Sequence, residues 1–179
     1  MKSMFTVLAF SLSAFAASPL WAQSTAVLTA TEDAYINSPN PTQNNGASNT
    51  LAISGTFGSL LKWDLSSIPA GSVITAASLS LKASAGTAQS YEAYEVLRAW
   101  TVAGVTWNST GTANWGTPGA SAVSDRGTTV LASIGSATTA TPVSYSLNAS
   151  GIVLLQGWLN GTTPNRGITI QDYANTDSM

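Results

Sequence analysis

Aromatic side chains outside the regular apolar stripes are the residues of this sequence best suited to contact a ligand. Trp115 falls in a Gly/Pro-rich loop over residues 108–121, where burial of so large a ring is hard to explain. Tyr91 and Tyr173 fall at the ends of predicted strands. Exposed rings of this kind stack on the apolar faces of sugars, while amides and carboxylates bond the hydroxyl groups. If the ligand is a sugar, Trp115 is therefore the leading candidate contact, followed by Tyr91 and Tyr173.

The remaining tryptophans of the main domain follow a different pattern. Three of them lie on predicted apolar stripes and are expected in the core, namely Trp63, Trp100 and Trp158. Trp107 stands at the end of a short predicted strand, where a core position and a ligand contact fit about equally well.

Charged side chains offer a second set of candidate contacts. Lys62 and Asp64 share one side of a predicted strand whose other side is apolar. That side is either a binding surface or a surface that is solvated or paired with charges of a neighbouring strand. An acidic polysaccharide would need cationic partners, and arginine suits carboxylates because its planar guanidinium binds them in a bidentate way. The candidate cations are Lys62, Arg98 and Arg166, besides Lys82 and Arg126.

Catalysis is not expected of this chain. It has neither cysteine nor histidine, which excludes the usual Cys/His zinc sites and every nucleophilic arrangement that needs an imidazole base. A glycosidase needs two carboxyl groups held ~5–10 Å apart across a cleft. Glu92 and Glu95 are one such pair, but on a strand they point to opposite faces, and other pairs are left open by the sequence.

The composition excludes other partners. Charged residues make up 8% of the chain, and the formal net charge is −2. No cluster of basic residues is available to neutralise phosphates, so no nucleic-acid partner is expected. No cofactor is expected either, although oxygen ligands are plentiful and a structural calcium ion is left open. Glu32, Asp33 and Asp172 are its candidate ligands, without a spacing that defines a site.

The first 22 residues have the layout of a secretory signal peptide. Lys2 supplies the positive charge, residues 4–17 form the apolar region, and Ala22 is the expected cleavage position. The apolar stretch ends at Pro19 and is too short for a membrane span. The chain is therefore predicted to be secreted, extracellular or at the cell surface, with a single domain over residues 23–179.

The rest of the chain is typical of an all-β domain. Short runs rich in Val, Ile, Thr, Tyr and Trp are separated by Gly, Asn, Pro and Ser clusters, as in antiparallel sandwiches. The predicted strands are 26–36, 50–54, 59–65, 73–83, 91–100, 105–107, 123–134, 143–147 and 167–173.

One segment has helical periodicity instead. Ile152, Leu155 and Trp158 recur at a spacing of three residues, which predicts one short helix over 149–160. Asn148 or Ser150 can cap its start, and a glycine follows its end.

The order of local motifs resembles the DNRLRE domain family, which is described as disaggregatase-related and grouped with carbohydrate-binding modules. The motifs that carry the likeness cover residues 32–36, 44–46, 60–65, 68–71, 76–81, 105–108, 152–158 and 165–168. Trp63 replaces the usual phenylalanine. The family's closing segment, an acidic stretch followed by an Arg-Pro-x-Leu strand, is missing, so the domain is expected to lack its last strand and to leave a neighbouring strand as an open edge.

The resemblance implies a jelly-roll-like antiparallel β-sandwich in a secreted or surface-anchored protein. It also implies binding of acidic or matrix polysaccharides, with partners such as the catalytic domains of a larger protein or surface neighbours. The function predicted from sequence is thus a secreted, non-catalytic polysaccharide-binding module. The alternative is a structural or adhesive cell-surface domain that binds no glycan.

Overall fold

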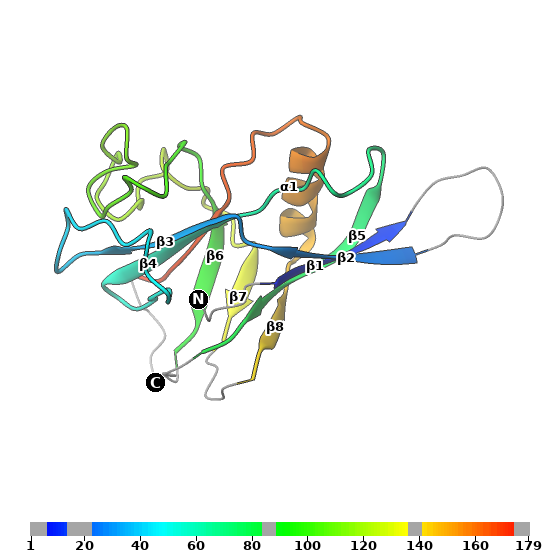
Figure 1. Ribbon diagram of the computed structural model, residues 1–179, viewed down its shortest axis with the longest axis horizontal. Coiled ribbons are helices and arrows are strands. Elements are labelled where there is room, and N and C mark those ends of the chain that lie inside the picture. The colour runs from blue at the N-terminus through cyan, green and yellow to red at the C-terminus, as the bar shows by residue number, and fades with distance from the viewer. Residues whose placement is uncertain (1–6, 14–22, 84–88, 136–140, 174–179) are drawn as a thin grey trace.

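The computed structural model describes residues 7–13, 23–83, 89–135 and 141–173, which form two antiparallel β-sheets and one helix (Figure 1). The first sheet has the strand order β2-β1-β5-β8 and the second has the order β3-β4-β9-β6-β7. The elements are β1 (Val7–Ser13), β2 (Gln23–Thr29), β3 (Glu32–Asn37), β4 (Phe57–Lys62), β5 (Val73–Leu81), β6 (Tyr91–Glu95), β7 (Ala132–Ile134), β8 (Val143–Ser146), α1 (Ala149–Leu159) and β9 (Ile168–Gln171). The predicted all-β sandwich with one short helix is confirmed.

The main core lies between the two sheets. Leu79 and Leu81 of β5 face it from the first sheet, and Ala93 of β6 with Ile168 and Ile170 of β9 face it from the second. This alternation of apolar and polar residues is what a sheet with one buried face requires. Trp63 and Trp158 are also buried in this core, as predicted.

A second core covers the outer face of the β3-β4-β9-β6-β7 sheet. Residues 97–126, the green loops beside β3 and β4 in Figure 1, supply the side chains that pack there. Leu60 of β4 points into this second core while Leu61 points into the first, and both are fully buried. The side of β4 that carries Lys62 is therefore apolar and buried at Leu60. The second core contains Ala34, Ile36, Leu60, Val96, Trp100, Val105, Trp115 and Ala120.

Helix α1 is tied to the first sheet at one end of the sandwich. The side chain of Asn148 accepts a hydrogen bond from the Gly151 amide at 3.1 Å, so Asn148, not Ser150, caps the helix. Gln156 accepts from the Ile74 amide at 2.8 Å and donates to the Ser72 carbonyl at 3.1 Å. These two bonds satisfy backbone groups at the start of β5.

Several predicted strands are shorter or absent. The run 26–36 is divided at residues 30–31 into β2 and β3, which belong to different sheets. The run 91–100 ends at Glu95, and only the last three residues of 123–134 form a strand. The segments 50–54 and 105–107 contribute only isolated bridges. Residues 97–126 leave the sheet after β6 and form the layer of loops over the second core, whereas Leu51 and Ile53 pack against the main core.

Residues Val7–Ser13, inside the predicted signal peptide, form strand β1 between β2 and β5. Their pairing is antiparallel on both sides. The rest of the predicted signal peptide lies outside the described residues, and its cleavage remains a prediction. Within the described part of the chain, no helix is long and apolar enough to cross a membrane.

Candidate functional site

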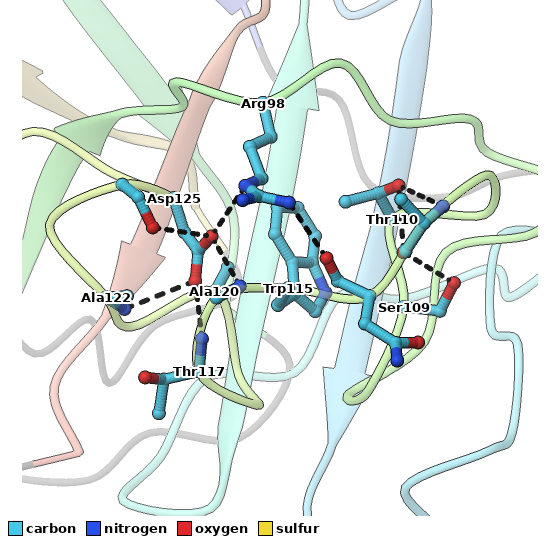
Figure 2. Close-up of polar contacts among 12 residues, drawn as sticks. Arg98, Ser109, Thr110, Trp115, Thr117, Ala120, Ala122 and Asp125 are labelled. Atoms are coloured by element: carbon cyan, nitrogen blue, oxygen red, sulfur yellow. Dashed lines mark hydrogen bonds and ion pairs between the residues drawn. The ribbon is translucent and has the colours of Figure 1, made fainter.

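The loop layer is held together by a buried carboxylate (Figure 2). Asp125 is fully buried, and its two oxygens accept hydrogen bonds from the amides of Gly116, Thr117 and Ala122 at 2.7, 3.0 and 3.3 Å. Arg98 neutralises this charge, with its Nε 3.0 Å from Asp125 Oδ1. A buried carboxylate is tolerated when it is paired and accepts several N–H bonds, so one side chain can fix the whole turn over 116–125.

Arg98 also joins this turn to the preceding one. Its Nη1 donates to the carbonyl of Asn114 at 2.9 Å. Inside that preceding turn, the buried Thr110 hydroxyl lies 3.1 Å from both the amide and the carbonyl of Ala113. Arg98, predicted from sequence as a ligand contact, thus has at least two of its guanidinium nitrogens occupied inside the protein.

Trp115, the leading ligand contact predicted from sequence, packs into the second core. Its ring is 4% exposed, and its Nε1 donates to the Thr106 carbonyl at 3.0 Å. Ala120, which follows in the same turn, adopts a left-handed conformation with a φ of 55° and is also buried. The Gly/Pro-rich loop therefore buries its tryptophan by folding back over β3 and β4.

The same turn positions a half-buried aromatic pair. The Gly119 amide donates to the Trp107 carbonyl at 2.7 Å. A Cβ at Gly119 would lie 2.8 Å from the Trp107 ring, so glycine is needed there for close approach. The rings of Trp107 and Tyr173 meet edge to face, with centroids 4.9 Å apart. This geometry is one that aromatic pairs prefer.

Tyr173 lies over the end of β4 and β9. Its hydroxyl occupies the space that a side chain at Gly58 would fill, beside the Cβ of Gln171. Burial raises the pKa of the Tyr173 hydroxyl, and the positive charge of Arg126 opposes this. Among the described residues, neither this hydroxyl nor the buried Oε1 of Gln171 has a hydrogen-bond partner.

Arg126 lies beside Tyr94 of β6. Its guanidinium lies 3.8 Å from the centroid of the Tyr94 ring, a cation–π contact, and its Nη1 donates to the Gly127 carbonyl. The Tyr94 hydroxyl donates to Glu92 Oε2 at 3.0 Å. Burial and this bond to the carboxylate both raise the pKa of Tyr94. Glu92 pairs with Gln171 across the β6–β9 ladder, which links this cluster to Tyr173.

We call Trp107, Tyr173, Tyr94, Arg126 and Glu92 the aromatic–arginine patch. It combines aromatic rings with one cation and one carboxylate on the outer face of the five-stranded sheet. Such a set can stack on the apolar face of a sugar and exchange hydrogen bonds with its hydroxyl or carboxylate groups. Trp107, Tyr173, Arg126 and Glu92 are partly exposed, while Tyr94 is buried beneath the guanidinium.

The structure does not bring the residues predicted from sequence into one site. Tyr91 is buried in the main core. Lys62 lies 2.6 Å from Glu32, and both side chains are partly exposed. Asp64 is exposed and accepts the Ser66 amide and hydroxyl at 2.8 and 2.9 Å, which lowers the pKa of its carboxyl. Tyr173 belongs to the aromatic–arginine patch, as do Trp107, which the sequence left open between core and ligand contact, and Arg126, which it named as a further cation.

Sequence reasoning named Arg126 only as a further cation, and it did not consider Tyr94 or Glu92 as ligand contacts. The alternation in β6 carried the signal, because it places Glu92 and Tyr94 on the face opposite Tyr91 and Ala93. No sequence pattern around Arg126 indicated that its side chain lies beside Tyr94. Arg126 reaches this face through its bridge with Val96.

A groove apart from the aromatic–arginine patch lies between β6 and α1. It has a volume of about 420 Å³, and its lining includes Glu95, Leu131 and Val153. Burial raises the pKa of Glu95, and the charge of Arg166 opposes this. The backbone carbonyl of Arg166 accepts the Trp100 indole N–H at 2.9 Å. Glu95 lies on the face of β6 opposite Glu92, so these two carboxylates do not form a pair across one cleft.

Metal binding finds little support in the described ranges. No three Asp or Glu side chains of these ranges gather as a metal ion would require. Glu32, a candidate calcium ligand, is bound by Lys62.

The chain also matches a known family. The model of carbohydrate-binding module family 96 matches residues 24–125, which include β2 to β6 and the loop layer up to Asp125. No curated protein matches the chain. Because the match covers more than half of the sequence, the chain belongs to carbohydrate-binding module family 96.

Proposed function

We propose that this member of carbohydrate-binding module family 96 is a secreted, non-catalytic module that binds a polysaccharide through the aromatic–arginine patch. The observation that carries the proposal is the half-buried Trp107–Tyr173 pair on the same sheet face as Arg126. The pair is held in place by Gly119 and Gly58, so little conformational entropy is lost when a sugar stacks on it.

An acidic polysaccharide fits this patch better than a neutral one. The Arg126 guanidinium is stacked on Tyr94, and its Nη1 donates to the adjacent Gly127 carbonyl, so its plane is fixed. A fixed, planar fork is the arrangement that favours a uronate carboxylate over a hydroxyl group. Glu92 alongside can accept hydrogen bonds from neighbouring sugar hydroxyls.

The non-catalytic part of the proposal rests on the placement of the carboxylates. Glu92 belongs to the patch, whereas Glu95 lies in the groove on the other face of β6. A hydrolytic reaction at the patch would need a second carboxyl group across the same cleft. Further domains of a longer polypeptide or surface neighbours would supply any chemistry on the bound polysaccharide.

Affinity electrophoresis and calorimetry on polyuronates and neutral glucans test the proposal. Trp107→Ala and Arg126→Gln should each weaken binding to a polyuronate by about tenfold or more, equivalent to ~1.4 kcal/mol. The matched controls are Tyr145→Ala, an aromatic residue of β8 in the other sheet, and Lys82→Gln, an exposed cation just after β5. Both controls should bind as the unaltered protein does.

Two outcomes would overturn this function. Equal loss of affinity in the control variants would remove the patch from the explanation. Failure to bind any soluble or insoluble polysaccharide, together with self-association, would favour the structural or adhesive domain instead. Release of reducing ends or unsaturated sugars by the purified chain would contradict the non-catalytic part alone.

A further inference from the structure

The groove between β6 and α1 has walls that hydrogen bonds tie to each other. The Asn148 side chain donates to the Val130 carbonyl at 2.7 Å, and the Asn148 amide donates to the Leu131 carbonyl at 2.8 Å. The Leu131 amide donates in turn to the Ala93 carbonyl of β6 at 2.8 Å. The start of α1, the segment before β7 and β6 are therefore fixed relative to one another. The groove of about 420 Å³ is a preorganised feature of the fold, with a volume typical of small-ligand sites.

The groove presents polar groups that the protein itself does not use. In the described part of the chain, the carboxylate of Glu95 makes no hydrogen bond and no ion pair. The hydroxyl groups of Thr129, Ser150 and Thr163 also line the groove, and they too bond to none of the described residues. One acceptor and three hydroxyl groups are thus available to a ligand.

Arg166 places a positive charge near the Glu95 carboxylate. It precedes Ile168 by two residues, and Ile168 pairs with Glu95 across the β6–β9 ladder. The charge of Arg166 lowers the pKa of Glu95 against the effect of burial, so the two side chains are electrostatic neighbours. No ion pair joins them, and the guanidinium has no hydrogen-bond partner within the described ranges. A single ligand can therefore meet a carboxylate and a guanidinium that the protein has left apart.

We propose that this groove is a carbohydrate site that binds a neutral sugar unit through its hydroxyl groups. A hydroxyl group both donates and accepts, so adjacent ring hydroxyls can donate to Glu95 and accept from Arg166 at the same time. The carboxylate would repel an anionic ligand, and the guanidinium would repel a cationic one. A peptide segment fits less well, because the N–H and C=O groups of a trans peptide bond point in opposite directions.

The rest of the lining suits the carbon face of a sugar ring. Leu131 is buried, Leu154 is half-buried and Val153 is 71% exposed, so aliphatic surface extends from the floor of the groove to its rim. A ligand that covers Val153 removes this apolar surface from water. Glu95 itself is a partly buried charge without a hydrogen bond, which costs stability. Residues of that kind are expected where a function requires them.

The groove is separate from the aromatic–arginine patch. Glu95 lies on the face of β6 opposite Glu92 and Tyr94. The family match ends at Asp125, and the lining residues other than Glu95 come after it in the sequence. The proposal therefore goes beyond the proposed function and does not depend on it.

A nuclear magnetic resonance titration of the isotope-labelled whole chain tests the proposal. The probes are the methyl glycosides of glucose, galactose and mannose, at concentrations up to about 50 mM so that a millimolar Kd is covered. The backbone amide signals of Leu131, Ser150 and Val153 should shift in a saturable way with at least one glycoside, while those of Tyr94 and Arg126 should not. Galacturonate and glucosamine have rings of the same size with a charge, and each should bind about fivefold more weakly or worse.

Three variants and one matched control assign the binding to the groove. Glu95→Gln and Arg166→Gln should each weaken glycoside binding by about fivefold or more, since hydrogen bonds to charged groups are roughly twice as strong as neutral ones. Val153→Trp should abolish binding, because the indole ring fills the groove. Asp64→Asn alters an exposed carboxylate outside the groove and should bind as the unaltered protein does. Melting temperatures of all four separate a loss of binding from a loss of folding.

Several results would overturn the proposal. They are the absence of saturable shifts at the groove, shifts at the patch instead, a preference for the charged sugars, and binding that survives both Glu95→Gln and Arg166→Gln. Polyuronate affinity should be the same in Glu95→Gln as in the unaltered protein, because the patch lies on the other face of β6. Loss of polyuronate binding alone would thus concern the proposed function, and loss of glycoside binding alone would concern this groove.

Discussion

Arg98 and Asp125 form an ion pair across the boundary between solvent and the second core, with the carboxylate fully buried and the arginine side chain 39% exposed. The pair joins residues far apart in the sequence, and the aspartate also holds three amides of the turn that carries Gly119. Because Gly119 lies against Trp107, the pair contributes to the placement of the aromatic–arginine patch without belonging to it.

Replacement of Asp125 by alanine should destabilise the domain strongly. Three amides would lose their acceptor and Arg98 would lose its counter-ion, a loss on the order of 3 kcal/mol in the free energy of unfolding. Arg98→Met should cost on the order of 2 kcal/mol, because it leaves the fully buried Asp125 carboxylate without its counter-ion, although the three amides still bind it. Urea denaturation of both variants and of the double variant measures the coupling. Additive effects would mean that the two side chains act independently.

Gly58→Ala should displace Tyr173 within the aromatic–arginine patch. The added methyl group would occupy the position of the Tyr173 hydroxyl, so the ring must move away from Trp107. Overpacking of this kind costs ~1–3 kcal/mol. Polyuronate affinity should also fall, because the aromatic pair is broken.

Two matched variants separate this clash from a general effect of alanine. Gly55→Ala should be neutral, since its added Cβ meets nothing within 4 Å. Tyr173→Phe removes the hydroxyl, so the double variant Gly58→Ala/Tyr173→Phe should be more stable than Gly58→Ala alone. Thermal melts of Gly55→Ala, Gly58→Ala, Tyr173→Phe and the double variant test this contact. If the double variant melts no higher than Gly58→Ala alone, the proposed contact between position 58 and the Tyr173 hydroxyl is contradicted.

The sequence predicts the elements whose signal is local. The alternation in β5 and β6 and the helical spacing around Leu155 gave the correct element types because each strand or helix buries one face. The second core depends on the contacts of Asp125 with Arg98 and with the loop amides. Contacts of this kind leave no periodic pattern of apolar residues in the sequence. The adjacent residues Leu60 and Leu61 were the available signal, since two buried faces require consecutive apolar residues in a strand.

Trp115 illustrates why the site was harder to predict than the fold. A tryptophan in a Gly/Pro-rich loop is expected to be exposed, yet this loop folds back and satisfies the indole N–H with the Thr106 carbonyl.

Trp115→Phe should lower the free energy of unfolding by about 1–3 kcal/mol, through the lost hydrogen bond and the smaller ring. Polysaccharide affinity should stay unchanged. A fall in affinity with an unchanged melting temperature would instead make Trp115 a ligand contact.

Glu95→Gln should stabilise the protein near neutral pH. Burial in the groove raises the pKa of Glu95 in the folded state above its unfolded value, despite the opposing charge of Arg166. The folded state therefore binds a proton more tightly than the unfolded chain, and stability falls as the pH rises through the interval between the two pKa values. Above the folded pKa, the full cost of the partly buried charge remains.

Glutamine removes this charge while keeping the shape of the side chain. The variant should melt at a higher temperature than the unaltered protein at pH 7, and the difference should vanish below about pH 4, where an unfolded glutamate is itself protonated. Arg166→Gln is the matched control and should have the opposite sign at pH 7, because Glu95 then loses the positive charge that offsets its burial. Melting curves between pH 3 and about 8 measure both effects, an interval chosen to bracket the carboxyl titration. An equal melting temperature of the glutamine variant and the unaltered protein at every pH would mean that solvent in the open groove hydrates the carboxylate as well as bulk water does.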